Sequence, residues 1–147
     1  MKGEVLTILL IEDNEDHAEL VKRSFEDNAV ANRLIHIKDG GEAEKYLFES
    51  DEMKDRRNYP NLILLDLRLP KIDGLEILKK IKTNENLKNI PVVVLTSSLA
   101  ERDLITAYTN YANSYLVKPL DFSKFTGMMK DLGFYWLGWN VNPFVKQ

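Results

Sequence analysis

The chain contains no cysteine, so disulfide bonds and zinc sites built on thiolates are excluded. It has no apolar run long enough to cross a bilayer, and its N-terminus lacks the basic and then apolar layout of a secretory signal. Charge of neither sign dominates, because the formal net charge is -3, which gives no indication of a broad nucleic-acid-binding surface. These absences predict a cytoplasmic protein that neither inserts into a membrane nor binds nucleic acid directly.

The length and composition are those of one globular domain. The chain has 147 residues, of which 44% are hydrophobic and 29% charged. We find no internal repeat and no low-complexity segment. We therefore expect a single domain over residues 1–147, with its core at about 6–137 and a tail at 138–147. Since the tail is short, we expect no separate output domain.

Five short runs rich in leucine, isoleucine and valine are typical of β-strands. They are Leu6–Ile11, Leu34–Ile37, Leu62–Leu65, Val92–Leu95 and Tyr115–Val117. The first, third and fourth are almost continuously apolar, as in parallel strands that are covered on both faces. The second is less uniform and suits the edge of a sheet.

Amphipathic stretches follow these runs, with apolar residues at three- and four-residue spacings. The predicted buried faces are Leu20, Val21, Ser24 and Phe25; Ala43 and Leu47; Ile77, Leu78 and Ile81; Leu104, Ala107, Tyr108 and Tyr111; and Phe125, Met129 and Leu132. Ser98 and Glu101 have the spacing of a capping box at the start of the fourth helix. The alternation predicts an α/β fold, a flavodoxin-like (βα)5 doubly wound parallel sheet with strand order 2-1-3-4-5.

Three carboxylic acids follow the ends of two of these strands. Glu12 and Asp13 come directly after Ile11, and Asp66 comes directly after Leu65. In the expected sheet the strand order reverses between these two strands, and ligands bind there at the carboxyl ends. Crowded carboxylates repel one another unless a cation joins them, and Mg²⁺ prefers oxygen ligands together with phosphate. The sequence therefore predicts a Mg²⁺ site at this edge.

Two more polar residues end strands on the same side of the sheet. Thr96 follows the fourth run and Lys118 follows the fifth. A hydroxyl and an ammonium opposite a metal–carboxylate cluster suit the oxygens of a transferring phosphoryl group, with Asp66 as the nucleophile. Taken singly, each residue has an ordinary explanation as a helix-terminal acid, a turn or capping residue, or a solvated charge. Only their joint placement favours the functional interpretation.

The ordered motifs also carry a family resemblance. They are Ile11-Glu12-Asp13, Leu65-Asp66-Leu67-Arg68-Leu69-Pro70 with Asp73-Gly74, Leu95-Thr96-Ser97, and Val117-Lys118-Pro119. Over about Leu6 to Leu137 the chain resembles the receiver domain of two-component response regulators. It looks closest to the single-domain regulators paired with phytochrome-like or other sensor kinases, which share its long loop before the third strand and its aromatic-rich last helix.

The resemblance implies how a phosphoryl group and a metal ion would be held. Asp66 would accept the phosphoryl group from a histidine of a sensor kinase. Asp13 would bind Mg²⁺ directly and Glu12 through water, and the backbone carbonyl of Arg68 would complete the protein ligands. Glu12 is a common variant where the family often has aspartate.

The resemblance also implies a switch. Thr96 and Lys118 would bind the phosphoryl oxygens, and Tyr115 would occupy the aromatic switch position. The Lys118–Pro119 peptide bond would be cis. Our hypothesis is that phosphorylation draws Thr96 inward and that Tyr115 fills the vacated space, which changes the surface of the fourth helix. Arg68 and Ser98 fall at positions that tune phosphoryl lifetime in the family.

The output is expected to be protein contact or phosphoryl relay, to a downstream protein target or a phosphotransfer protein. The segment Phe134-Tyr135-Trp136-Leu137-Gly138-Trp139 holds both tryptophans of the chain. We expect part of it to cap the core and the rest to form a partner surface or a homodimer contact, because large apolar patches seldom stay exposed on monomers. We expect His17 and His36 to be surface or helix-face residues, and Arg56 and Arg57 to be solvated loop charges.

Three other functions remain open. A Mg²⁺-dependent phosphohydrolase with an aspartyl nucleophile often needs a second acid two residues after the nucleophile, where this chain has Arg68. A flavin- or nucleotide-binding module needs a glycine-rich loop after the first strand, where Glu12 and Asp13 would repel phosphate. A receiver-like scaffold that is never phosphorylated would not need all four chemical positions.

Overall fold

The computed structural model describes residues 5–142 and contains one parallel sheet of five strands in the order β2-β1-β3-β4-β5. The strands are β1 (Leu6–Ile11), β2 (Asn32–Ile37), β3 (Leu62–Leu65), β4 (Val92–Thr96) and β5 (Ser114–Val117). The predicted strand order is confirmed, and β2 lies at an edge as expected. The predicted strand bounds agree to within two residues at every end.

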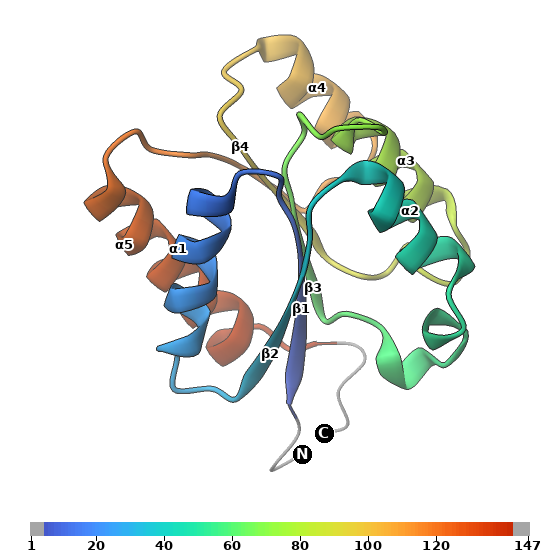
Figure 1. Cartoon of the computed structure of the whole chain (residues 1–147), viewed down its shortest axis with the longest axis horizontal. Coiled ribbons are helices and arrows are strands. Elements are labelled where there is room, and N and C mark those ends of the chain that lie inside the picture. Colours follow the sequence, from blue (N-terminus) through green and yellow to red (C-terminus); the bar gives the residue numbers. More distant parts are fainter. Residues whose placement is uncertain (1–4, 143–147) are drawn as a thin grey trace.

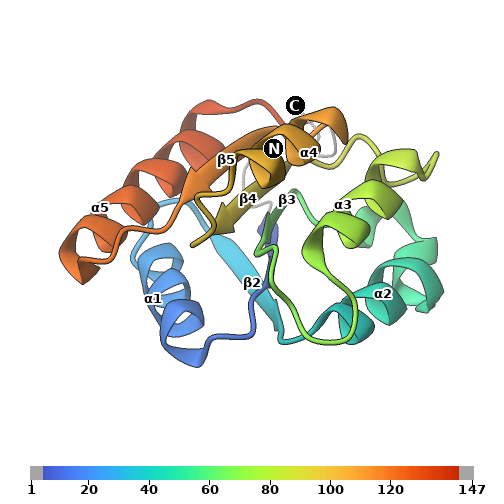
Figure 2. The same cartoon turned by 90° about the horizontal axis from the view of Figure 1, so that it is seen from above.

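Helices cover both faces of the sheet. They are α1 (Glu15–Glu26), α2 (Gly40–Glu49), α3 (Gly74–Thr83), α4 (Glu101–Thr109) and α5 (Phe122–Gly133). Figure 1 and Figure 2 show α1 and α5 side by side on one face, with α2 and α3 on the other and α4 next to α3. The doubly wound α/β arrangement predicted from the alternation is confirmed.

Each central strand supplies side chains to two separate cores, which explains the continuous apolar runs. Leu9 and Ile11 of β1 pack with α2, α3 and α4, whereas Ile8 and Leu10 pack with α1 and α5. Successive side chains of a strand point to opposite faces, so a strand covered on both faces has no position left for a polar residue. Polar residues are therefore confined to the strand ends, where the candidate site lies.

The face of α4 differs from the prediction. Of the predicted residues only Ala107 is buried, whereas Leu104, Tyr108 and Tyr111 are 39%, 50% and 75% exposed. Asp103 is buried instead, with 2% of its surface exposed. A buried carboxylate needs hydrogen-bonded partners, and Asp103 has them in two loops that are distant in the sequence. The helix is thus rotated about its axis relative to the orientation that its apolar spacing predicts.

The predicted capping box at the start of α4 is wrong. The N-cap residue is Ala100, whose side chain makes no capping hydrogen bond. The hydroxyl of Ser98 donates instead to a carboxylate oxygen of Asp103 at 2.5 Å. The hydroxyl of Ser98 is therefore bonded to Asp103 and does not act as the cap of the helix.

The connection between α2 and β3 contains two short 3-10 turns, Glu52–Lys54 and Arg56–Asn58. Although the segment is mostly polar, Met53 and Tyr59 are buried and extend the core over α2 and α3. Arg57 pairs with Asp55 at the surface, at 2.8 Å, in agreement with its predicted place in a solvated loop.

The aromatic segment forms a six-residue π-helix, Phe134–Trp139, that continues α5. Leu137 is buried against the core below α1 and α5, while Phe134, Tyr135 and Trp139 are more than half exposed. The expectation that only part of the segment caps the core is confirmed. No helix among residues 5–142 is both long enough and apolar enough to cross a membrane.

Gly74 opens α3 directly against the end of β3, and we expect this position to accept no side chain. A Cβ there would lie 2.1 Å from the backbone oxygen of Asp66 and 2.6 Å from the Cα of Leu67. Overpacking of this kind costs about 1–3 kcal/mol. We predict that Gly74→Ala lowers the free energy of unfolding by that amount, as measured by urea denaturation.

The matched control is Gly127→Ala in α5, because a Cβ at Gly127 meets nothing within 4 Å. Alanine is favoured over glycine inside a helix by about 0.5–1 kcal/mol. The control variant should therefore be as stable as the wild type or slightly more stable. Equal unfolding midpoints for the two variants would contradict the close approach at Gly74.

Candidate functional site

The three predicted acids meet at the carboxyl ends of β1 and β3. Ile11 and Leu65 are opposite each other in the parallel register, so the residues that follow them are neighbours. One carboxylate oxygen from each of Glu12, Asp13 and Asp66 lies within 4.8 Å of the others. Glu12 and Asp66 are buried, and Asp13 is exposed at the rim. The expected convergence of the three acids is therefore present.

Lys118 brings a cation into this cluster from the end of β5. Its Nζ lies 2.6 Å from Oε1 of Glu12 and 3.1 Å from Oδ2 of Asp66. The side chain of Lys118 is only 3% exposed. Its backbone N–H donates to the carbonyl oxygen of Thr96 at 2.8 Å, which fixes the start of the chain segment after β5. The ammonium is thus held inside the protein by two carboxylates.

The buried acids carry more negative charge than one ammonium offsets. The pKa of Glu12 is raised to about 7, first by burial and then by the negative charge of Asp66, while Lys118 opposes the shift. A raised carboxyl pKa means that the ionised form is unfavourable at this position. The local electrostatics therefore favour the entry of an additional cation.

The donor set fits a hard divalent ion. All three groups are carboxylates, the preferred ligands of Mg²⁺ and Mn²⁺, and Asp13 faces solvent from which an ion could enter. The second oxygen of Glu12 accepts the backbone N–H of Asn14 at 3.1 Å, and one oxygen of Asp66 accepts the N–H of Leu67 at 2.7 Å. These bonds orient both side chains. The Arg68 carbonyl, two residues after Asp66, remains a predicted ligand.

A hollow of about 460 Å³ opens over the cluster. Asp13, Asp66, Arg68, Thr96 and Lys118 are among the residues that line it. The structure therefore brings the predicted phosphoacceptor, hydroxyl and ammonium to the wall of one solvent-accessible space. A small phosphorylated molecule or a side chain of another protein could approach Asp66 through it.

Thr96 and Tyr115 are connected through Ser98. The hydroxyl oxygen of Thr96, which is 1% exposed, accepts the backbone N–H of Ser98 at 3.3 Å. The hydroxyl of Tyr115 donates to the carbonyl oxygen of Ser98 at 3.1 Å. The two predicted switch residues thus hold the same loop from either side, although they are not in contact through a bond of their own.

Arg68 connects the mouth of the hollow to α4. Its guanidinium forms an ion pair with Asp103 and lies 3.6 Å from a carboxylate oxygen of Asp73. Since Ser98 also donates to Asp103, the buried acid joins the loops that follow β3 and β4. The sequence analysis missed Asp103. The available signal was its four-residue spacing from Ala107, but an acid at such a position is ordinarily assigned to the surface.

The expected cis peptide bond between Lys118 and Pro119 is absent. Every peptide bond in residues 5–142 is trans. A trans bond before proline is favoured intrinsically by about 0.5–1 kcal/mol. With the trans bond, the ammonium of Lys118 already reaches both acids.

The two histidines are closer to the site than the sequence analysis predicted. His17 Nδ1 lies 2.9 Å from the ammonium nitrogen of Lys118, and His17 lines the hollow. His36 Nε2 lies 2.7 Å from the backbone oxygen of Glu12. Neither contact could be found from spacing, because the partners are 101 and 24 residues away in the sequence.

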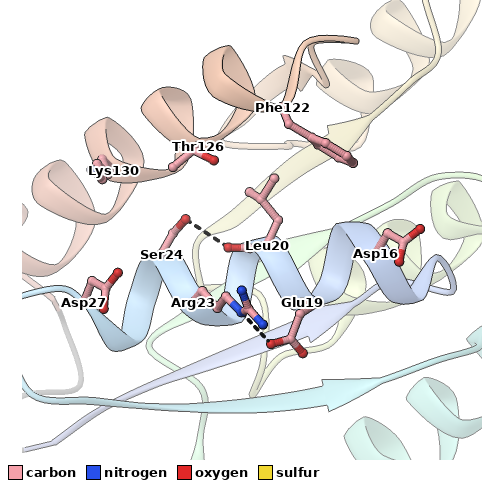
Figure 3. Close-up of a pocket in the computed structure, with 9 residues that line it drawn as sticks. All are labelled: Asp16, Glu19, Leu20, Arg23, Ser24, Asp27, Phe122, Thr126 and Lys130. Carbon is pink, nitrogen blue, oxygen red and sulfur yellow. Dashed lines mark hydrogen bonds and ion pairs between the residues drawn. The ribbon is translucent and has the colours of Figure 1, made fainter.

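A second hollow, of about 600 Å³, lies between α1 and α5 (Figure 3). Both interactions drawn among its lining residues stay within α1: Ser24 donates to the carbonyl oxygen of Leu20, and Arg23 pairs with Glu19. Its acids are spread along the helix, and the only acidic cluster within residues 5–142 that could hold an ion is the one at Glu12, Asp13 and Asp66. The smaller hollow is therefore the candidate site.

Comparisons with known proteins found relatives that cover most of this chain. The family model of the response regulator receiver domain matches residues 8–130. The probable methanogenesis regulatory protein FilR2 of Methanothrix harundinacea is 47% identical over 136 residues, which cover 92% of this chain and 86% of that protein. Response regulator Rcp1 of Synechocystis is 41% identical over 130 residues, which cover 88% of each chain.

Solved structures agree as well. The crystal structure of the Mn²⁺-bound form of Rcp1 superposes with a TM-score of 0.88 and 39% identity, over 94% of this chain and 99% of that one. The phosphorylated cyanobacterial phytochrome response regulator RcpA gives a TM-score of 0.89 and 36% identity, over 95% and 99% of the two chains. At these sequence identities, the similarity to both proteins extends beyond the fold.

We predict that Asp13→Asn weakens the binding of a divalent ion roughly tenfold or more, which corresponds to about 1.4 kcal/mol. The reason is that the exposed carboxylate of the cluster is lost while the shape of the side chain is kept. Titration of Mg²⁺ and of Mn²⁺ in a calorimeter measures the affinity. Asp16→Asn removes the same charge from the first turn of α1, outside the cluster, and should leave the affinity near that of the wild type. Equal losses in both variants would contradict a specific site.

Proposed function

The chain belongs to the response regulator receiver domain family, and we propose that it accepts a phosphoryl group on Asp66 from a histidine of a sensor kinase, in a reaction that depends on Mg²⁺. The observation that carries this proposal is the cluster of three carboxylates, two of which contact the Lys118 ammonium, beside an open hollow. The protein catalyses only its own phosphorylation and dephosphorylation and then signals through contacts with other proteins.

Asp66 is prepared to act as the nucleophile. Its Oδ1 is held by the N–H of Leu67 and its Oδ2 by the ammonium of Lys118, so the carboxylate has a fixed orientation at the floor of the hollow. A carboxylate oxygen attacks the phosphorus atom, the bond between phosphorus and the kinase imidazole breaks, and the electron pair of that bond stays on the imidazole nitrogen. The product on Asp66 is an acyl phosphate.

The remaining groups of the site bind the phosphoryl oxygens. The ammonium of Lys118 is 3.1 Å from Asp66. It can bind the carboxylate before transfer and an oxygen of the phosphoryl group afterwards. Within the described residues, the hydroxyl proton of Thr96 has no acceptor, so it can turn toward a phosphoryl oxygen. A bound Mg²⁺, held by Glu12, Asp13, Asp66 and the carbonyl of Arg68, would offset the negative charge that accumulates during transfer.

The proposed switch runs from Thr96 to α4. An added phosphoryl group carries a charge of roughly -1.5 to -2 and three strong acceptor oxygens. Thr96 moves toward it, and Tyr115 gives up its hydrogen bond to Ser98 and turns into the space that Thr96 leaves. The loop before α4 is held by both residues through Ser98, so its rearrangement changes the surface of α4 and β5.

The partners follow from the family and from the named relatives. A receiver domain implies a sensor kinase, and the relative RcpA is described as a phytochrome response regulator that was crystallised in its phosphorylated form. We propose a phytochrome-like sensor histidine kinase as the donor for this chain. The output passes to a protein target or a phosphotransfer protein, and the exposed rings of Phe134, Tyr135 and Trp139 offer a contact for it or for a homodimer.

The main enzymatic alternative is a phosphohydrolase that uses the same nucleophile. It would need a general acid two residues after Asp66. Arg68 occupies that position, and a guanidinium does not serve as a general acid. Its ion pairs with Asp103 and Asp73 give it a structural partner instead. The residue at this position favours a stoichiometric phosphoacceptor over a turnover enzyme.

We predict that incubation with acetyl phosphate and Mg²⁺ adds one phosphoryl group to the wild type, detected by mass spectrometry of the intact protein. The group should be released by hydroxylamine, as expected for an acyl phosphate. Asp66→Asn keeps the shape of the side chain but lacks the nucleophilic oxygen, and this variant should gain nothing. Asp121→Asn, at the start of α5, is the control and should be modified like the wild type.

A gain of mass that persists in Asp66→Asn would place the acceptor elsewhere. Repeated turnover of a phosphomonoester by the wild type would instead favour the phosphohydrolase. Because the two outcomes differ in stoichiometry, a single titration of donor against protein separates them.

We further predict that Tyr115→Ala leaves the extent of Asp66 phosphorylation unchanged but reduces the response of α4. The amide resonances of residues 101–109 report this response when acetyl phosphate and Mg²⁺ are added. In the variant their shifts should fall to about half or less of the wild-type values, because the ring that fills the space beside Thr96 is missing. A full α4 response in Tyr115→Ala would show that coupling does not pass through the ring.

A further inference from the structure

The Lys118 ammonium has a third partner that the proposed reaction does not use. An ammonium has three N–H donors. Two of them meet Glu12 at 2.6 Å and Asp66 at 3.1 Å, and the third meets Nδ1 of His17 at 2.9 Å. The first two acceptors are charged groups that a metal ion and a phosphoryl group would also engage. The third is an imidazole from a different element, α1, and neither the metal ion nor the phosphoryl group would engage it.

His17 is held in place by one contact of its backbone and one contact of its ring. Its N–H donates at 3.0 Å to the side chain of Asn14, the N-cap residue of α1. Its ring packs against Phe125 of α5, with centroids 5.6 Å apart and planes tilted by 57°. Phe125 is 1% exposed and belongs to the core between α1 and α5. The imidazole therefore reaches Lys118 from a rigid position.

The contact fixes the protonation state of the ring. An ammonium can only donate, so Nδ1 must be the unprotonated nitrogen and Nε2 must carry the proton. The same direction follows from the surroundings: burial and then the charge of Lys118 lower the pKa of His17, although the nearby carboxylates Asp66, Asp16 and Asp13 oppose the shift. The imidazole is a neutral acceptor that points at the amine.

We propose that His17 is a positioning residue for phosphoryl transfer to Asp66, which holds the Lys118 ammonium at the wall of the hollow where the phosphoryl oxygens arrive. The inference rests on the proposed function of Lys118. His17 itself lines that hollow. When a divalent ion and a phosphoryl group take over the carboxylate oxygens, the imidazole is the acceptor that stays with the amine. Without it, the long lysine side chain loses an anchor, and small displacements of a reacting group slow a reaction strongly.

Two substitutions separate positioning from packing. His17→Leu keeps an apolar side chain against Phe125 but removes the acceptor. His17→Asn places a side-chain oxygen near the position of Nδ1 and so restores an acceptor for Lys118. With acetyl phosphate and Mg²⁺, we expect His17→Leu to be phosphorylated about tenfold more slowly than the wild type and His17→Asn within about threefold of it. Mg²⁺ affinity should be unchanged in both, since no metal ligand is altered.

Each outcome of the rate measurement has one meaning. Phosphorylation of His17→Leu at the wild-type rate overturns the inference. An equally slow reaction of His17→Asn and His17→Leu also overturns it, because the restored acceptor would then fail to restore the rate. A wild type that gains no phosphoryl group overturns the proposed function and this inference with it. Thermal unfolding of both variants checks that each is folded at the assay temperature.

A second measurement tests the contact without any phosphorylation. The chain has two histidines, so nitrogen-15 NMR of the imidazoles gives two sets of signals, and the set that vanishes in His17→Asn belongs to His17. We expect the tautomer protonated at Nε2, with Nδ1 unprotonated. A proton on Nδ1 of His17 in the wild type overturns the inference even if Asp66 is phosphorylated normally.

Discussion

The site depends on one electrostatic constraint: two buried carboxylates share a single ammonium. Glu12 and Asp66 are 1% and 8% exposed, and Lys118 lies between them. Burying ionised groups is costly unless they are paired and hydrogen-bonded. One ammonium cannot balance these acids and Asp13 together, and the pKa of Glu12 is raised by its burial and by the neighbouring charge of Asp66. The protein is thus built around a deficit of positive charge that a divalent ion would relieve.

The sheet makes this arrangement possible because it brings together the ends of strands that are far apart in the sequence. β1 and β3 are neighbours because the strand order reverses between them, and this places Asp66 beside Glu12. Lys118 follows β5, which is two strands away from β3. Its four-carbon side chain therefore spans the end of β4 beside Thr96. Gly74 lets α3 start against the backbone of Asp66, so the nucleophile sits on a tightly packed turn.

The parts that sequence patterns predicted are those that follow from local rules. Continuous apolar strands and spaced helical faces gave the fold, and polar residues at strand ends gave the acids, Thr96 and Lys118. The errors at α4 and at His17 share a different cause, because each depends on a partner distant in sequence. Asp103 is buried on account of Arg68, 35 residues away, and His17 faces inward on account of Lys118. No periodicity within one helix carries that information.

The same distant contacts explain how a change at Asp66 can reach the surface. Arg68 stands at the mouth of the hollow, and its guanidinium pairs with the buried carboxylate of Asp103 on α4. Ser98 binds that carboxylate and also the two groups of the proposed switch, Thr96 and Tyr115. Since Asp103 is 2% exposed, it cannot exchange these partners for water without moving the helix. The position of α4 is therefore set by polar groups at the site as well as by the buried Ala107. In the proposed switch, α4 is the element whose placement responds to charge at Asp66.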